Sequence, residues 1–513
     1  MKWLLRFRLE RGLEKAKTMT KRIEDTLKLN VADFGPIVNA EIDLRPLTVF
    51  IGPSNTGKSY LAILIYALHQ VFSRTTRSLR HRYFLTKPPA VQDLSTAEIK
   101  ALLEAAKPII SALAADNSYN LALSRPVAEV VRSNFNGMAD ALSEEIARCF
   151  GVGESHKLIR RGRTNTARII IQRKPYDGAD LLQHAMSLAQ RPEFTSTVPA
   201  ENKLLLDSRD LDQSLYPILM QYLNKLDAID PKFLASEIVS SICGMILPFL
   251  FGPLHSPAYY LPADRTGVMH AHNVVVSALI ASAPAGGLRP AGTMPTLSGV
   301  LADFLNELIE IDQKKQGMKK GNIAGQIEEL ILEGSVSINR SPHVNYPRFV
   351  YRPRGWKEKD NLALANASSM VSELAPVILY LRHMIKSRDV LIVEEPESHL
   401  HPAMQVEFTR QLAALVQAGV RVIVTTHSEW LLEELANIVY RSQIPKAKRN
   451  GAIALRKDQV GAWLFKPQRS PKGSVVDEVC FNDSGVYSSG YNEVSEVLHN
   501  EWAAISSQIM NGS

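Results

Sequence analysis

Two glycines, a lysine and a serine occur at the spacing GxxxxGK[ST] in residues 52–59. Each residue type suits a phosphate ligand. Backbone N–H groups of a glycine-rich loop face anionic oxygens, Lys58 supplies a point charge, and Ser59 offers a hydroxyl to Mg²⁺. We therefore expect this segment to bind the phosphates of a nucleoside triphosphate. The residues expected to contact this nucleotide are Gly52, Pro53, Ser54, Asn55, Thr56, Gly57, Lys58, Ser59 and Tyr60.

Such a loop must join a strand to a helix, and the flanking sequence supplies both. Residues 47–51 are an apolar run that predicts a buried strand. Residues 60–68 are apolar over a length that predicts a helix. Strand, glycine loop and helix together form the context in which this spacing is specific.

A pair of carboxylates follows another apolar strand far downstream, at residues 390–393. Glu394 is expected to hold Mg²⁺ through its water shell, and Glu395 to polarise the attacking water. His427 follows a third apolar strand. Ligands of open parallel sheets gather at the carboxyl ends of the strands. We therefore expect Lys58, Glu395 and His427 to converge on one γ-phosphate as catalytic groups.

The segment EEPESHLHP at residues 394–402, followed by TTHS at residues 425–428, resembles the acidic strand, D-loop and H-loop of the ABC/SMC-type P-loop ATPases. It is particularly similar to the branch that contains the overcoming-lysogenization-defect (OLD) ATPases and the related stand-alone "AAA" ATPases of bacterial phage-defence systems. The resemblance covers residues 25–72 and 256–437.

The resemblance implies a fold, a reaction and an assembly. The expected fold is an α/β, P-loop ABC/SMC-like ATPase head with a mixed sheet, interrupted by a mainly helical insertion. The implied nucleotide is ATP with Mg²⁺, and the implied reaction is hydrolysis to ADP and phosphate. The implied assembly is a homodimer, or a higher oligomer, formed through the ATPase heads. It would contain two composite sites that open and close with hydrolysis.

In such families a signature helix of a second subunit caps the γ-phosphate, and the resemblance places its start at Ser368 and Ser369. Serines at a helix start offer hydroxyl and backbone N–H donors to an anion. Met370 stands where a glycine is commonly expected, so close approach of the backbone to phosphate stays open. An ordinary N-cap for the following helix is the alternative.

Two histidines in the same motif, His399 and His401, suggest a metal-nuclease alternative. Alternate residues point apart on a strand and are poorly aimed at one ion on a helix. A D-loop turn that crosses the dimer interface accounts for both histidines. Pro402 would then start the next helix.

Lys58 and Glu394 are 336 residues apart, so a large insertion must interrupt one nucleotide-binding fold. Sustained apolar heptads, which a long coiled coil needs, do not occur in it. We divide the chain into four parts. A basic N-terminal tail (residues 1–24) precedes the N-terminal part of the head (25–75), and a mainly helical insertion (76–255) separates it from the C-terminal part of the head (256–513). The insertion is expected to contain a strand at residues 167–172 and helices at residues 96–114, 138–150, 179–189 and 211–226.

The 86 residues after His427 are expected to add closing strands at residues 463–465 and 475–476. They contain no DxD sequence, which the Toprim nuclease domain of OLD nucleases needs to hold metal. We therefore expect an ATPase without a nuclease of its own. An effector, a nuclease or a toxin, would be a separate protein.

Composition limits the partners and the compartment. The net charge is +7, and basic residues cluster near residues 74–82, 157–174 and 446–457, so DNA is a candidate partner. Three distant cysteines form no CxxC pair, which argues against a disulfide framework or a zinc site and favours the cytoplasm. The longest apolar stretch contains glycines and prolines, and it predicts a buried helix and loop without a membrane partner.

The sequence therefore predicts an ATP-binding and ATP-hydrolysing ABC/SMC-like ATPase. In this hypothesis nucleotide drives dimerisation, and the chain is the sensor or motor subunit of a bacterial defence complex. Two alternatives stay open. One is a DNA-repair or chromosome-associated SMC-like ATPase, and the other is a non-hydrolysing scaffold that nucleotide locks.

Overall fold

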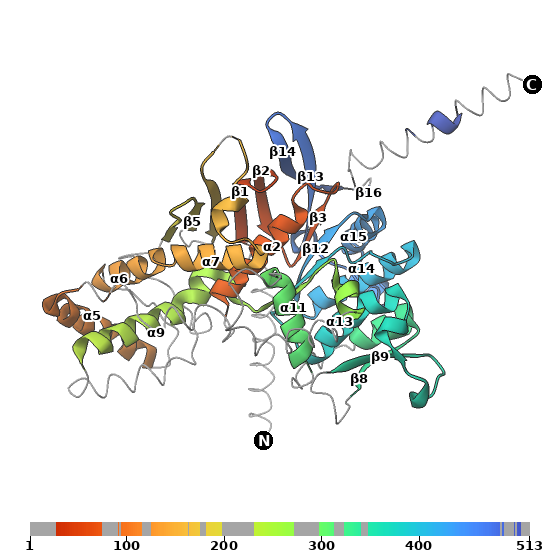
Figure 1. Ribbon diagram of the computed structural model, residues 1–513, viewed down its shortest axis with the longest axis horizontal. Helices are drawn as coiled ribbons and strands as arrows, with labels where there is room; N and C mark the ends of the chain where they lie inside the picture. The colour runs from red at the N-terminus through yellow and green to blue at the C-terminus, as the bar shows by residue number, and fades with distance from the viewer. Residues whose placement is uncertain are drawn as a thin grey trace, which may run out of the picture.

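One large mixed sheet carries the glycine-rich loop and forms the framework of the protein (Figure 1). Its strands are β1 (Leu27–Phe34), β2 (Ile37–Leu44), β3 (Leu47–Ile51), β4 (Ala167–Arg173), β5 (Leu182–Leu188), β6 (Glu193–Ser196), β7 (Ala258–Leu261), β11 (Val390–Glu394), β12 (Arg421–Thr426), β13 (Val460–Arg469) and β14 (Lys472–Glu478). The computed structural model describes residues 27–73, 91, 94–114, 125–162, 164–174, 181–196, 230–270, 297–311, 323–339, 347–482, 485–486, 497 and 500–503.

The strand order is β6-β5-β4-β1-β2-β14-β13-β3-β12-β11-β7. The five strands from β13 to β7 run parallel to one another. Antiparallel pairs dominate the other half. The predicted α/β fold with a mixed sheet is therefore confirmed. The predicted strands at residues 47–51 and 390–393 lie on either side of β12, the apolar strand that precedes His427.

Helices cover both faces of the sheet, which gives three layers. Successive residues of β11 alternate between two apolar cores, with Val390 and Ile392 in one and Leu391 and Val393 in the other. The first core includes α2 (Lys58–Phe72), α5 (Thr96–Ala114), α6 (Arg125–Asn136), α7 (Ala139–Phe150) and α9 (Pro231–Phe251). The second includes α11 (Gly299–Glu310), α12 (Ile323–Ile327), α13 (Ser369–His383), α14 (Pro402–Gln417) and α15 (Glu429–Arg441).

Two smaller sheets complete the described strands. β8 (Gly334–Asn339), β9 (Arg348–Pro353) and β10 (Leu362–Ala363) form one, and β15 (Phe481–Asn482) and β16 (Gly485–Val486) form the other.

The insertion is built partly onto the head sheet. β4 pairs antiparallel with β1, and β5 and β6 continue outward from it. Helices α5, α6 and α9 pack against one another and extend to the left of the sheet in Figure 1. The division of the chain into parts remains a prediction. Residues 1–24, 74–82 and 211–226 lie outside the described residues.

One predicted helix of the insertion was wrong. Residues 179–189 were expected to be helical, but the described part contains β5. Its residues alternate between buried and more exposed positions, with Leu182, His184, Met186 and Leu188 buried. This period of two is the strand pattern. The predicted helices at residues 96–114 and 138–150 and the predicted strand at residues 167–172 are confirmed. They correspond to α5, α7 and β4, whose bounds differ from the predicted ones by one residue or less.

The longest apolar stretch, predicted as a buried helix and loop, lies in helix α9 and the short helical turn Gly252–His255 that follows it. Asp230 caps α9 by accepting a hydrogen bond from the Phe233 N–H at 2.9 Å. Among the described helices, only the segment Pro231–His255 has the length and the apolar composition that a membrane span needs. However, 76% of the most apolar part of this segment is buried inside the protein. It has the burial of a core helix.

Candidate nucleotide site

The loop between β3 and α2 has a backbone that only particular residues tolerate. Gly52 and Gly57 adopt φ values of 143° and 101°. A Cβ at Gly52 would lie 2.5 Å from the carbonyl oxygen of Phe465, and a Cβ at Gly57 would lie 2.8 Å from the side chain of Ile37. Glycine is therefore required at both positions. Helix α2 begins at Lys58, so the N–H groups of its first turn face the loop.

Lys58 is held over this loop. Its ammonium nitrogen donates to the carbonyl oxygens of Gly52 and Pro53, both at 2.8 Å. Burial lowers its pKa to about 8, while the nearby carboxylates of Glu395, Glu397 and Glu394 act in the opposite direction. Lys58 is therefore mainly cationic at neutral pH, as a phosphate ligand must be.

Glu394 ends β11 beside Ser59 and is nearly fully buried. Burial raises its pKa, although the nearby hydroxyls of Ser59 and Tyr260 and the N–H of Ala263 favour the ionised form. The Ala263 N–H donates to Oε2 at 3.2 Å. Oε1 accepts no hydrogen bond of good geometry from a described residue. A buried carboxylate oxygen of this kind next to a serine hydroxyl fits Mg²⁺, which prefers oxygen ligands.

Glu395 and His427 lie at the adjacent strand ends. The backbone of Glu395 has φ 41°, and its N–H donates to the Thr425 carbonyl of β12 at 2.8 Å. This left-handed conformation aims the side chain out of the strand, where its Oε1 lies 3.5 Å from His427 Nε2. Their side chains are 38% and 33% exposed, so both groups face the open edge of the sheet. The structure thus brings the predicted pair together.

Two residues of this site were missed from the sequence, and the first is Glu397. Its Oε1 accepts a hydrogen bond from the His427 N–H at 2.5 Å, and it thereby joins the two loops that follow β11 and β12. Burial raises its pKa. The only sequence signal was a third carboxylate near Glu394 and Glu395. The role of Glu397 depends on the turn at Pro396, and the spacing of the three glutamates in the sequence does not reveal this turn.

The second missed residue is Arg265, which is fully buried beneath the carboxylate pair. Its guanidinium donates to the backbone carbonyls of Glu394 and Glu395. The sequence segment after β7 contained this arginine, but no local pattern indicated that it would lie below β11.

The predicted signature serines lie at an exposed helix start. Ser368 is the N-cap of α13, and its hydroxyl accepts from the Val371 N–H at 3.4 Å. Both Ser368 and Ser369 are exposed. Within the described residues, no hydrogen bond joins either serine to Lys58. The structure shows the capping role, and the phosphate-contacting role stays a prediction.

The two histidines of the motif occupy a turn before α14. His401 is the N-cap of this helix, and its Nδ1 accepts from the Ala403 N–H at 3.3 Å. His399 has φ 61°, and α14 starts at Pro402 as predicted. Across the described ranges, no group of three or more His, Cys, Asp or Glu side chains could hold a metal ion. The turn and the N-cap account for the positions of these two histidines.

Tyr60, predicted to touch the nucleotide, packs against aromatic side chains. Its ring centroid lies 6.1 Å from that of Phe34 and 5.1 Å from that of Phe150. Because Phe150 belongs to α7, Tyr60 connects the loop helix α2 to the insertion. Its nucleotide contact stays a prediction.

Several arginines of the basic clusters have structural partners. Arg160 forms an ion pair with Asp33 at 2.6 Å, and buried Arg173 donates to the Phe249 carbonyl. Arg449 donates to the Ser442 carbonyl at 2.6 Å, and Arg456 pairs with Asp458 at 2.9 Å. These contacts reduce the charge free for a phosphate backbone. Exposed members of the clusters include Lys157, Arg161, Arg168, Lys174, Lys446 and Lys448.

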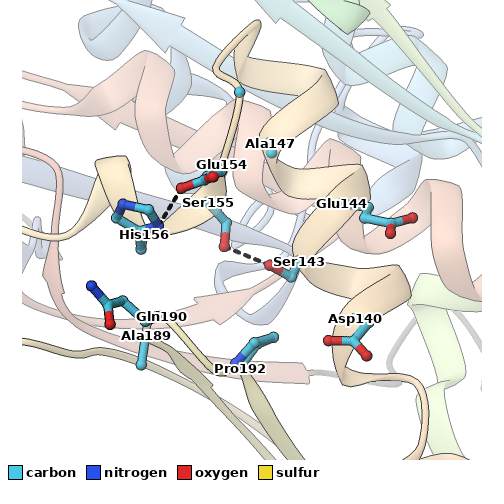
Figure 2. A pocket seen from close by; sticks show the side chains of 11 residues that line it. Asp140, Ser143, Glu144, Ala147, Glu154, Ser155, His156, Ala189, Gln190 and Pro192 are labelled. Atoms are coloured by element: carbon cyan, nitrogen blue, oxygen red, sulfur yellow. Dashed lines mark hydrogen bonds and ion pairs between the residues drawn. The ribbon is translucent and has the colours of Figure 1, made fainter.

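A separate cavity of about 500 Å³ lies between α7 and the turn that joins β5 to β6 (Figure 2). Ser143 and Ser155 share a hydrogen bond of 2.6 Å in its wall, and His156 lies 3.0 Å from Glu154. The carboxylates of Asp140 and Glu144 also line it. The cavity is acidic and contains none of the predicted site residues.

The low pKa of Lys58 gives a testable pH dependence. The cationic form binds phosphate, so the Kd for ATP should be constant from pH 7 to about 8 and then rise by up to about tenfold per pH unit. Equilibrium titration with a fluorescent ATP analogue between pH 7 and 9.5 measures this. In Lys58→Arg the cation persists throughout, so any remaining binding should lose this dependence. An unchanged wild-type Kd at pH 9.5 would contradict the role of Lys58.

Comparison with known proteins gives one family match. Residues 294–432 match the AAA ATPase domain family. This segment contains Glu394, Glu395 and His427, and it excludes the loop at residues 52–59. No curated protein matches the chain in sequence.

Solved structures of SMC heads resemble the chain at low sequence identity. One is an SMC head bound to the C-winged helix domain of ScpA, with 11% identity, a TM-score of 0.40, and coverage of 90% of this chain and 99% of that chain. Another is the SMC head domain from Thermotoga maritima, with 11% identity, a TM-score of 0.34, and coverage of 89% and 99%. A third is an Smc head with an extended coiled coil bound to the C-terminal domain of ScpA derived from Pyrococcus furiosus, with 10% identity, a TM-score of 0.37, and coverage of 93% and 99%.

Proposed function

We propose that the chain binds MgATP at residues 52–59 and hydrolyses it, as an ABC/SMC-like ATPase head. The observation that supports this most directly is the pairing of β3 with β12 and of β12 with β11. These three parallel strands bring Lys58, Glu395 and His427 to one edge of the sheet. They also join the loop to the segment that matches the AAA ATPase domain family.

Each side chain has a distinct task in this proposal. The loop N–H groups and Lys58 bind the β- and γ-phosphates. Ser59 and Glu394 would hold Mg²⁺, which when bound neutralises charge on the phosphate oxygens. Glu395 orients the attacking water and accepts its proton, and His427 contacts the γ-phosphate beside it.

A second copy of the chain completes the site in this proposal. Glu395 and His427 leave the γ-phosphate side open, while Ser368 and Ser369 are exposed at the start of α13. The N–H groups in the first turn of a helix are suited to an anion. Two heads facing each other would each supply this helix start to the nucleotide of the other.

Mass measurement by light scattering tests this assembly. With saturating MgATP, the Glu395→Gln variant should double its mass, because nucleotide is bound and not consumed. The double variant Ser368→Ala, Ser369→Ala in the same background should dimerise at least about tenfold more weakly, since two charge-assisted contacts per site are lost. Lys58→Ala should stay monomeric. A monomer at saturating ATP in the Glu395→Gln variant would contradict the composite site.

We further propose that this ATPase is the cytoplasmic sensor or motor subunit of a bacterial defence complex with a separate nuclease or toxin. The resemblance at residues 394–402 to the stand-alone ATPases of phage-defence systems supports this assignment. Co-purification from the native host, with products of neighbouring genes identified, tests it. Recovery of a nuclease or toxin would support the assignment. Recovery of the ATPase alone, with salt-sensitive and ATP-dependent DNA binding, would favour the chromosome-associated alternative.

A further inference from the structure

We infer that Arg265 is a positioning residue that couples the start of helix α13 to the catalytic carboxylate Glu395. The inference rests on the proposed ATPase function and adds to it a physical link within one subunit. In this inference the position of α13 in one subunit controls the position of Glu395 in the same subunit.

The Arg265 guanidinium makes four hydrogen bonds and one ion pair. Nη1 donates to the Pro262 carbonyl at 2.9 Å and to the Glu394 carbonyl at 2.5 Å. Nη2 donates to the Glu395 carbonyl at 3.3 Å and forms an ion pair with the Glu373 carboxylate. Nε donates to the Glu373 carbonyl at 3.2 Å. A guanidinium is the only side chain with this many donors in a fixed plane, and lysine would lose at least two of them.

The partner carboxylate, Glu373, lies near the start of α13. It is four residues after Ser369, or about 6 Å along the helix axis. Its side chain is 1% exposed, and the Thr266 hydroxyl donates to its second oxygen. A second contact joins the same elements, since His270 Nε2 lies 2.8 Å from the Ser372 hydroxyl. Arg265, Thr266 and His270 thus all contact side chains in the first two turns of α13.

The other end of the guanidinium fixes the backbone of the catalytic pair. Its two η nitrogens bind the consecutive carbonyls of Glu394 and Glu395, where the chain leaves β11 with φ 41° at Glu395. A displacement of α13 must move Glu373, then the guanidinium plane, and then these two peptide groups. Displacement of a catalytic group by about 1 Å can cost about 100-fold in rate. Small movements of α13 are therefore sufficient to control hydrolysis.

The ion pair between Arg265 and Glu373 is fully buried. Burial lowers the pKa of Arg265, and the Glu373 carboxylate opposes this effect most strongly. Removal of one partner would leave an uncompensated buried charge, which is strongly destabilising. Arg265→Lys keeps the charge and removes the planar bonds, so it is the appropriate variant. Thr266→Val is a milder second variant, because it removes one bond to Glu373 and no charge.

A double-mutant cycle distinguishes coupling from simple structural support. Arg265→Lys should lower kcat for MgATP about 30- to 100-fold and leave the Kd for ATP within about twofold. Ser368→Ala with Ser369→Ala should also lower kcat. Combining both changes should lower kcat no further than the more damaging of the two, because they interrupt one connection. Thr266→Val should show the same pattern with a smaller loss, so the cycle can be run on it if Arg265→Lys does not fold.

A matched control lies on the same helix. Arg382 pairs with Glu328 and donates to the Val336 carbonyl, so Arg382→Lys also weakens a planar ion pair of α13. It should leave kcat within about twofold. Multiplicative losses in the cycle, or a normal kcat in Arg265→Lys, would overturn the coupling while wild-type hydrolysis persists. Absence of wild-type turnover would instead contradict the proposed function itself.

Discussion

Replacement of Glu395 with glutamine should lower the turnover number for MgATP by about 10²–10⁴-fold and leave the Kd for ATP within about threefold. The carboxylate lies 3.5 Å from His427 Nε2 at the open edge of the sheet, where it can accept a proton from water. Glutamine keeps the size and the backbone contacts but cannot accept that proton. The loop that holds the phosphates is unchanged. Single-turnover hydrolysis with labelled ATP and an independent binding titration measure the two effects separately.

Glu429→Gln supplies the matched control. Glu429 is exposed in the first turn of α15, two residues after His427, so the same charge is lost close to the site without loss of the proposed base. Its turnover should stay within about twofold of wild type. Equal turnover in Glu395→Gln and wild type would contradict the assignment of Glu395. Nucleotide-locked dimers with no wild-type hydrolysis would favour the scaffold alternative.

The parts of the site that could be predicted are those specified by local sequence. The strand, loop and helix around Gly52 and Lys58 depend on contiguous apolar runs and on glycines whose φ values are positive. β11 and β12 are likewise short apolar runs that end in polar side chains. The rule that parallel strands place such side chains at one edge was then enough to bring Glu395 and His427 together.

The missed residues depend on contacts between distant segments. Arg265 lies 129 residues before Glu394 in sequence, and its bonds to the Glu394 and Glu395 carbonyls exist only once β7 has paired with β11. Glu397 acquires its role because the chain turns at Pro396 and returns to His427. Neither propensity nor spacing carries such information. β5 is a different case, because its residues alternate with the period of a strand and the helix prediction overlooked this pattern. Its pairing with β4 and β6 confirms the strand.

Trp463→Ala should lower the free energy of unfolding by about 3–5 kcal/mol, since a large aromatic side chain is removed from a packed core. Trp463 is 2% exposed on β13, which the sequence predicted as a closing strand but did not place next to β3. Its ring approaches that of Phe50 on β3 edge-on, with centroids 6.5 Å apart. A Cβ at Gly461 would lie 2.0 Å from the indole, so the ring covers that glycine closely. The cavity would open directly beside the strand that leads into the phosphate loop.

Trp430 provides the control for this last variant, because it is 54% exposed on α15. Trp430→Ala removes the same side chain from a solvated surface and should change the free energy of unfolding by no more than about 0.5 kcal/mol. Urea denaturation without nucleotide compares the two variants, with intrinsic fluorescence and circular dichroism as independent probes. Equal shifts for both tryptophans would contradict the packing of β13 against β3. A selective loss in Trp463→Ala would show that the packing of β13 against β3, a strand more than 400 residues away in sequence, stabilises the fold.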